Sequence, residues 1–171
     1  MAYIAISETI RFLTRSHMSR APFQILVIPF RRVGEESECA VLRRRDMDIW
    51  QAVAGGGESG ESPQQAAVRK AREEFGLDRT VALYPLQTTT SIPARFFADR
   101  DSWPTSTYVV PEYAFAADLT DVEIKLSHEH TAVQWLDYKA ASELLRFDSN
   151  RTALSELHER LLAADLPRPV H

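Results

Sequence analysis

Cysteine is almost absent from this chain, since Cys39 is the single one among 171 residues. One cysteine excludes an internal disulfide framework and is typical of a protein kept in a reducing cytoplasm. We expect Cys39 to be a buried strand residue and not a nucleophile, because the sequence offers no identifiable histidine partner for a thiolate.

Long apolar segments are also missing. No apolar run reaches about 18 residues, so no transmembrane helix is predicted. The N-terminal stretch lacks the basic region and the continuous apolar region of a secretory signal peptide. We therefore expect a cytoplasmic protein without a membrane partner.

The chain has no excess of basic residues. Its 20 Lys and Arg against 24 Asp and Glu give a formal net charge of −4. Binding to a nucleic-acid polymer or to an anionic membrane surface needs clustered positive charge, so neither partner is expected. A ligand that carries phosphates would need local neutralisation by a few cations.

The remaining composition is that of an ordinary globular protein, with 44% hydrophobic and 26% charged residues. The length predicts one domain. We place this domain at residues 18–165, followed by a loose tail at 166–171. Residues 1–17 are treated as an N-terminal extension of open origin, because Met18 could be the natural start.

Alternation of apolar and polar residues predicts a mixed sheet with helices on both faces, an α/β fold. We expect the glycines after Ala54 to end the third strand. The predicted strands are 23–32, 38–45, 49–56, 81–92, 107–119 and 131–137, and the predicted helices are 63–75, 139–145 and 150–165.

Helix 63–75 has the clearest boundaries. Ser62 and Pro63 form an N-cap and a first-turn proline, Gln65 completes a capping box, and Gly76 supplies the C-terminal stop. At about 100° per residue, Glu73 and Glu74 lie on the polar side of this helix.

Two adjacent carboxylates on a rigid helix, with a loop acid and accessible glycine carbonyls before it, are typical of a site for a hard cation such as Mg²⁺. Such an ion could bridge to a polyphosphate and activate a water. The alternative is that Glu73 and Glu74 form surface ion pairs with Arg69 and Lys70, each worth well under ~1 kcal/mol. Composition alone leaves both interpretations open.

The spacing within "GGGESGESPQQAAVRKAREEFGL" resembles the motif of the Nudix hydrolases, and "PEYAFAADL" and "SHEHTAVQWLDYKAASELL" are similar to the bacterial dihydroneopterin triphosphate pyrophosphohydrolase branch. The resemblance implies an α/β/α sandwich around a mixed sheet. It also implies hydrolysis of a small-molecule phosphoanhydride with Mg²⁺, or with Mn²⁺ in its place, in a family where homodimers are common. The motif positions are Gly55, Glu61, Arg69, Glu73, Glu74, Gly76 and Leu77.

The same resemblance assigns roles to individual residues. The implied metal ligands are Gly55, Glu73, Glu74 and the distant Glu129, for which a solvated loop acid is the alternative. Glu61, Glu73 and Glu74 are the implied catalytic acids, and Arg69 is expected to support them by ion pairing.

Lys70 departs from the motif, which has a glutamate directly after the arginine. An ammonium donates hydrogen bonds but cannot accept them, so Lys70 can serve neither as a metal ligand nor as a base at neutral pH. Three outcomes stay open: full activity through the other acids, weak activity with reduced metal occupancy, or a binding pocket in which Lys70 meets a phosphate.

Two further residues are candidate substrate contacts. Trp50 could stack on a pterin or purine, although a tryptophan near a strand end is also typical of a core. Arg45 shares a strand face with Arg43 and could bind phosphate oxygens, or line a solvated edge.

Overall fold

The computed structural model describes residues 19–77 and 81–170, so the predicted extension at 1–17 lies outside the described residues. No helix in this part of the chain is long and apolar enough to cross a membrane. The elements are β1 (Arg20–Val33), β2 (Glu36–Arg44), β3 (Trp50–Gln51), β4 (Val53–Glu58), α1 (Pro63–Phe75), β5 (Leu83–Pro93), the 3-10 turns η1 (Ala94–Phe96) and η2 (Ala98–Ser102), β6 (Val109–Asp118), β7 (His130–Leu136), α2 (Tyr138–Leu144) and α3 (Asp148–Leu162).

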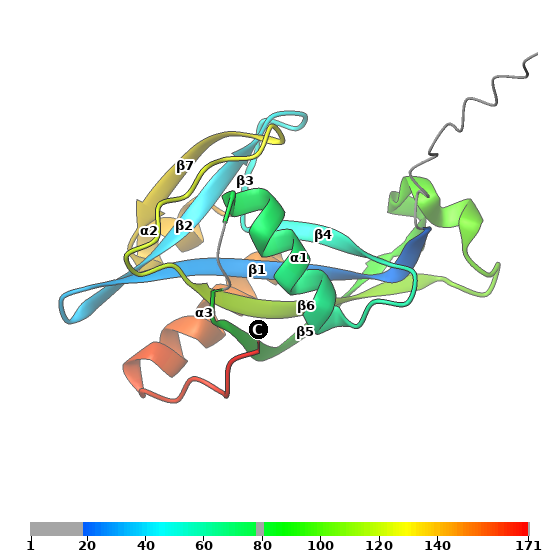
Figure 1. Ribbon diagram of the computed structural model, residues 1–171. Coiled ribbons are helices and arrows are strands. Elements are labelled where there is room, and N and C mark those ends of the chain that lie inside the picture. The colour runs from blue at the N-terminus through cyan, green and yellow to red at the C-terminus, as the bar shows by residue number, and fades with distance from the viewer. Residues whose placement is uncertain (1–18, 78–80, 171) are drawn as a thin grey trace, which may run out of the picture.

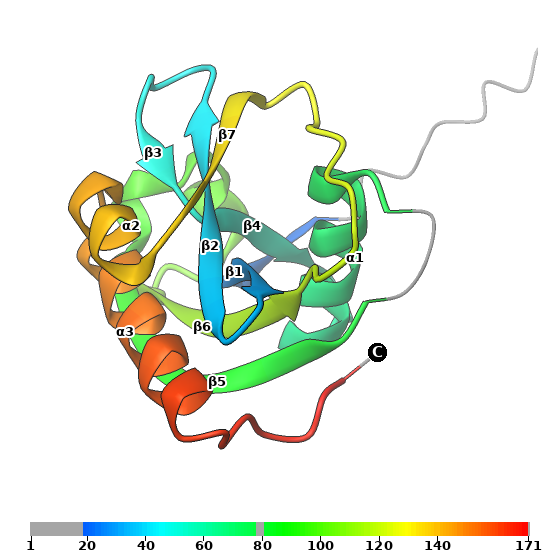
Figure 2. The ribbon, with the colours of Figure 1, turned by 90° about the vertical axis from the view of Figure 1, so that its left-hand side faces the viewer.

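Strand β1 is the centre of a mixed seven-stranded sheet (Figure 1). It pairs antiparallel with β2 and β4 and parallel with β6, while β5 pairs with β6 and β7 with β2. Helix α1 covers one face of the sheet, and α2 and α3 cover the other (Figure 2). The predicted α/β/α sandwich around a mixed sheet is therefore confirmed.

Alternation along β1 builds two hydrophobic cores. Ile25 and Val27 point to the α1 side, and Leu26 and Ile28 point to the α3 side. The strand is buried on both faces, which is why it reads as a nearly continuous apolar run. Cys39 belongs to the α3-side core, where burial raises its thiol pKa to about 12, as expected for a buried strand cysteine.

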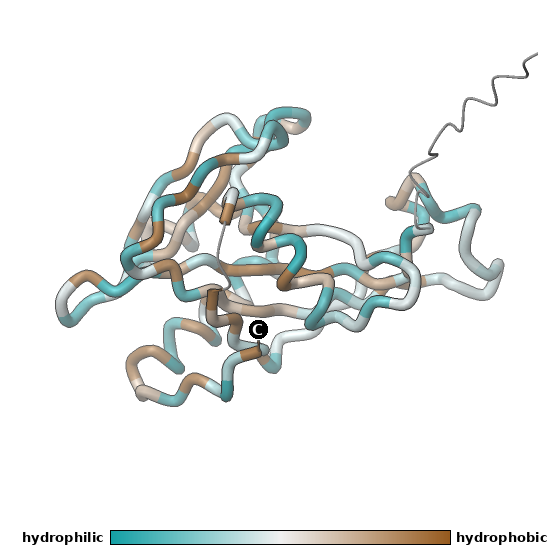
Figure 3. Tube along the Cα trace, in the orientation of Figure 1, coloured by the Kyte–Doolittle hydropathy of each residue, from teal (hydrophilic) through white to brown (hydrophobic). Residues whose placement is uncertain are grey.

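The hydropathy-coloured trace in Figure 3 shows the same division, with apolar segments concentrated along the sheet and polar colour along much of α1. The polar side of α1 carries Lys70 and the half-exposed Glu73, whereas Glu74 is buried. The opposite face of α1 buries Ala67, Ala71 and Phe75 against the sheet. The apolar stripe therefore fixes α1 against the sheet and leaves the charged side chains outside this apolar contact.

The expectation that glycines end the third strand is wrong. Strand β4 continues through them to Glu58, with Gly55 opposite Ile25 and Gly56 opposite Gln24. Glycine is needed here for space, since a Cβ on Gly57 would lie 1.9 Å from Cζ of Phe23. The predicted strand 49–56 also divides into β3 and β4, because the first piece pairs with β2 and the second with β1.

The expectation of a loose tail is wrong at Val170. Its backbone N–H donates to the Leu83 carbonyl at 2.7 Å, and the Leu83 N–H donates to the Val170 carbonyl at 3.2 Å. The apolar Val170 side chain also packs against the α1-side core. The start of β5 thus offers both backbone partners and an apolar surface that hold this part of the chain.

Helix α1 begins and ends as predicted. The Ser62 hydroxyl accepts from the Gln65 N–H at 3.2 Å, and the Gln65 side chain accepts from the Ser62 N–H at 2.8 Å. At the other end Gly76 adopts φ 61°, a left-handed conformation that favours glycine.

We expect Ser62→Ala to lower the free energy of unfolding by about 1 kcal/mol, because it removes this N-cap. Urea unfolding followed by circular dichroism measures the change. Ser59→Ala is the matched control, since Ser59 is exposed and only its backbone forms a described hydrogen bond. Equal stability of the two variants would contradict the prediction.

Candidate active site

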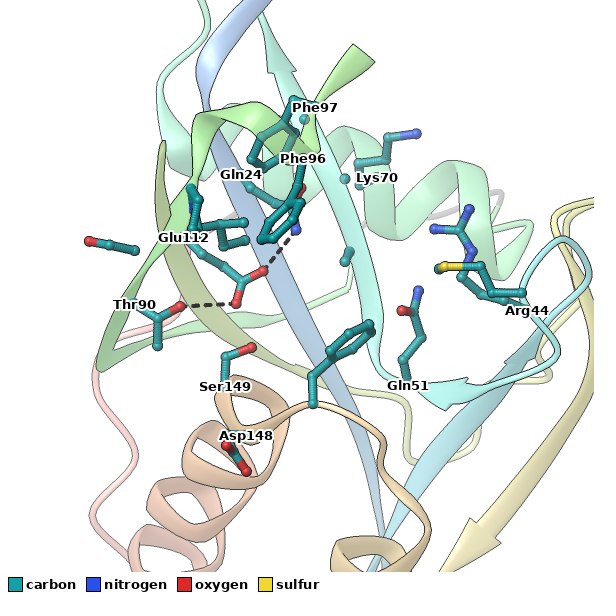
Figure 4. A pocket seen from close by; sticks show the side chains of 18 of the residues that line it. Gln24, Arg44, Gln51, Lys70, Thr90, Phe96, Phe97, Glu112, Asp148 and Ser149 are labelled. Carbon is teal, nitrogen blue, oxygen red and sulfur yellow. Dashed lines mark hydrogen bonds between the residues drawn. The ribbon is translucent and has the colours of Figure 1, made fainter. Parts of the chain in front are cut away.

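A pocket of about 820 Å³ opens beside β4, between α1 and the start of α3 (Figure 4). Lys70 and Arg44 lie toward one side of the view, and Glu112, Thr90 and Phe96 toward the other. The pocket joins the α1 glutamate region to a face of the sheet formed by residues distant in the sequence. It is large enough for a nucleotide-sized molecule.

Lys70 lies between the two neighbouring glutamates of α1. Its Nζ is 3.0 Å from Oε2 of Glu73 and 3.7 Å from Oε1 of Glu74. Its aliphatic chain rests on Gly55, where a Cβ would lie 2.7 Å from Cε of Lys70. The glycine of β4 therefore makes room for the lysine, and the ammonium is the cation that the two carboxylates hold.

Glu74 is the buried member of the pair, with 3% of its surface exposed. The Ser127 hydroxyl donates to its Oε2, and Nδ1 of His130 lies 3.4 Å from the same oxygen. Burial by itself would raise the pKa of Glu74, but the bonds from His130 and Ser127 and the charge of Lys70 outweigh it and bring the pKa to about 2. Glu74 therefore stays ionised at neutral pH and is a poor proton acceptor.

Arg69 ties the glycine strand, the following loop and the helix together. It donates to both carboxylate oxygens of Glu61 at 2.8 Å and to the Gly56 carbonyl at 3.1 Å. These hydrogen bonds lower the pKa of Glu61. A longer contact of 3.4 Å reaches Glu73. This geometry agrees with a supporting role for Arg69, and it engages both oxygens of Glu61.

The predicted metal ligands come together only in part, and the arrangement does not fit a resident divalent cation. Glu73, Glu74 and Gly55 surround Lys70, whose ammonium already neutralises the two carboxylates. Glu129 lines the same pocket. Within residues 19–77 and 81–170, no group of three or more acidic, histidine or cysteine side chains is placed to hold a metal.

The three predicted substrate contacts do not all lie at the pocket. Lys70 lines the pocket, whereas the lining contains neither Arg45 nor Trp50. Arg45 donates to the His128 carbonyl at 2.8 Å, and Trp50 packs against the α3-side core. Arg44 lines the pocket instead, at the end of β2 and two residues after the α1-side Leu42.

Several pocket residues were missed by sequence reasoning. Glu112 had a usable signal, since it is an acid in an apolar strand and shares the face of the buried Ala114 and Ala116. Gln51 gave none. The missed lining residues include Gln24, Gln51, Thr90, Phe96, Glu112 and Phe147.

Comparisons with known proteins agree on one family. The NUDIX domain model matches residues 22–157. The chain is 31% identical over 141 residues to the dihydroneopterin triphosphate diphosphatase of Escherichia coli K12, covering 80% of this chain and 92% of that protein. A solved structure from Listeria monocytogenes, whose name places it among NUDIX hydrolases, has a TM-score of 0.77 and 45% identity, covering 85% of this chain and 98% of that chain.

A further relative is longer. The chain is 36% identical over 121 residues to a Myxococcus xanthus protein named octanoyltransferase, and the match covers 69% of this chain but 31% of that protein. The chain thus spans about a third of this relative, so the activity in its name is not transferred here.

The buried Glu74 should make the free energy of unfolding depend on pH. A folded-state pKa of about 2, below the ordinary 4.5, means that ionised Glu74 contributes stability that is complete above pH 4.5 and is lost as the pH falls toward 2. We expect Glu74→Gln to lower the free energy of unfolding by on the order of 2 kcal/mol at pH 7, with a smaller loss below pH 4.

Denaturant unfolding at several pH values measures this difference. Glu73→Gln is the matched control, because Glu73 is half-exposed and its ion pairs are worth less than ~1 kcal/mol. A Glu74→Gln cost that does not change with pH would contradict the assignment.

Proposed function

The chain belongs to the NUDIX family, and from that premise we propose that it hydrolyses a phosphoanhydride bond in dihydroneopterin triphosphate, a nucleoside triphosphate or a dinucleoside polyphosphate. Dihydroneopterin triphosphate heads this set because the Escherichia coli relative is named as its diphosphatase. The pocket supports the proposal, since it has a cationic end at Lys70 and a separate end that can receive a heterocycle.

The observation that carries the proposal is the Lys70 ammonium in the wall of this pocket. A positive charge there can neutralise phosphate oxygens in a protein whose overall charge is negative. Arg44 lines the same region, although its guanidinium is paired with Asp46 at 2.8 and 2.6 Å. Lys70 is likewise paired, with Glu73 at 3.0 Å, so a phosphate chain would compete with that carboxylate for the ammonium.

Attack by water also needs a proton acceptor. Glu61 is bound by Arg69, and Glu74 is buried with a pKa of about 2. Glu129 lines the pocket and, among the described contacts, only its backbone forms hydrogen bonds. We therefore assign Glu129 to hold and activate the water, with the half-exposed Glu73 beside Lys70 as the alternative.

A second candidate is a weakened module that binds a nucleotide-like ligand without efficient cleavage. The position of Lys70 favours it, because the ammonium occupies the place between two carboxylates that a divalent cation would need. Dependence on Mg²⁺ or Mn²⁺, a homodimer and a cytoplasmic location stay predictions.

Product release from a panel of pterin and nucleoside triphosphates, with Mg²⁺, Mn²⁺ or EDTA, tests the function. We expect slow release of pyrophosphate or phosphate by the native protein and an increase of at least about tenfold in Lys70→Glu with Mg²⁺, because the substitution replaces the ammonium by a third carboxylate. Lys139→Glu is the matched control, since Lys139 is exposed and outside this pocket.

Efficient turnover by the native protein would show that Lys70 does not impair the site. A silent native protein that becomes active as Lys70→Glu would support the binding module. Absence of any product from either protein, with every metal and substrate, would contradict the hydrolase proposal.

A further inference from the structure

Glu112 is an acid buried beneath the pocket, with 4% of its surface exposed. Its Oε2 accepts from Nε2 of Gln24 at 2.8 Å, and its Oε1 accepts from the Thr90 hydroxyl at 3.2 Å (Figure 4). Both described partners are neutral. A buried carboxylate usually needs a charged partner or a full set of donors, and a carboxylate can accept about four hydrogen bonds.

The partners of Glu112 are themselves held in position. Arg20 donates from Nη2 to Oε1 of Gln24 at 3.0 Å, so the amide group of Gln24 points its NH₂ toward Glu112. Thr90 approaches from β5, and Glu112 lies opposite Gln24 in the parallel pairing of β1 and β6. The carboxylate is therefore fixed from two sides, and its remaining acceptor capacity is directed to the pocket that it lines.

Gln51 has a buried hydrogen-bond donor that lacks an acceptor among the described residues. It is 3% exposed, lines the same pocket, and its Nε2 has no hydrogen-bond partner within the described part of the chain. An unpaired buried donor lowers the stability of the free protein. A pocket that keeps such a donor is suited to a ligand with an acceptor.

Two exposed aromatic side chains also line the pocket. Phe96 on η1 is 68% exposed and Phe147 before α3 is 41% exposed, and both line the pocket. Exposed phenyl rings in a pocket that Glu112 and Gln51 also line provide apolar surfaces on which a flat heterocycle can stack. The pocket thus offers stacking surface, an acceptor and a donor.

We propose that this pocket recognises the 2-amino-4-oxopyrimidine edge shared by pterin and guanine, with Glu112 on one side and Gln51 on the other as the specificity-determining residues. That edge carries a ring N–H and an adjacent amino group, which match a carboxylate, and a carbonyl oxygen, which matches the Gln51 donor. The inference rests on the proposed function only for the phosphate chain, which would extend from this heterocycle toward Lys70.

Other bases fit this arrangement less well. Adenine and cytosine place a ring nitrogen lone pair beside their amino group, so the lone pair would face the Glu112 carboxylate. Inosine keeps the ring N–H and the carbonyl but lacks the amino group. A site with buried polar groups rejects an analogue that leaves one of them unpaired.

Neopterin and free nucleosides test the inference because they contain no phosphoanhydride bond. We expect native protein in EDTA to quench neopterin fluorescence saturably, and guanosine to compete at least about tenfold more strongly than inosine or adenosine. Glu112→Gln should weaken neopterin binding at least about tenfold and should reverse the preference toward adenosine, because a glutamine amide matches the adenine edge. Glu123→Gln, an exposed site, is the matched control.

Gln51→Leu is the second variant, in case Glu112→Gln does not fold. It should weaken neopterin binding about fivefold to tenfold and leave the midpoint of thermal unfolding unchanged or higher, because it removes an unpaired buried donor. If Gln51 had only a structural role, Gln51→Leu would not lower the affinity for neopterin while stability stayed equal or rose.

The two proposals can fail separately. Base-selective binding without hydrolysis of any triphosphate would retain the recognition site and reject the hydrolase. Hydrolysis without preference among bases would retain the hydrolase and overturn the recognition site. Absence of saturable neopterin binding by folded native protein, or an unchanged guanosine-to-adenosine ratio in Glu112→Gln, would also overturn it.

Discussion

The close packing of α1 on the glycine segment of β4 is the contact on which the rest of the site depends. Lys70 crosses Gly55 at a distance that excludes a Cβ, and Arg69 bonds the neighbouring Gly56 carbonyl. The apolar stripe of α1 fixes the helix against the sheet, so Lys70 is held in the wall of the pocket. A Cβ on Gly55 would displace the Lys70 side chain from its position over the strand.

Charge balance at this contact explains how a crowded set of acids remains ionised. Arg69 neutralises Glu61, while Lys70, Ser127 and His130 stabilise Glu74. Lys70 is therefore part of the local electrostatic structure, and it also faces the pocket. Lys70 therefore affects both the stability of this region and the neutralisation of a bound phosphate. For this reason its substitution distinguishes a hydrolase from a binding module.

Two buried polar residues that line the pocket, Gln51 and Glu112, reduce the stability of the free protein. Gln51 keeps a buried donor without a described partner, and Glu112 keeps a buried charge with neutral partners. Both features reduce the stability of a free protein, and a hydrophobic residue at either position would cost less. Such deviations from good packing are expected where a ligand completes the interactions.

The sequence by itself determined the sheet, the helices, the limits of α1 and the local cluster around Lys70, because these depend on periodicity, caps and spacing within one helix. It misjudged the glycines of β4, since it treated glycine as a strand breaker while the side chains of Lys70, Arg20 and Phe23 required the space. Only the tertiary structure decided that Arg44 and not Arg45 reaches the pocket, and that Glu112, Gln51 and Phe147 meet there. Strand register and the approach of α3 bring these residues together, and apart from the acid in the apolar strand β6 they leave no signal in the local sequence.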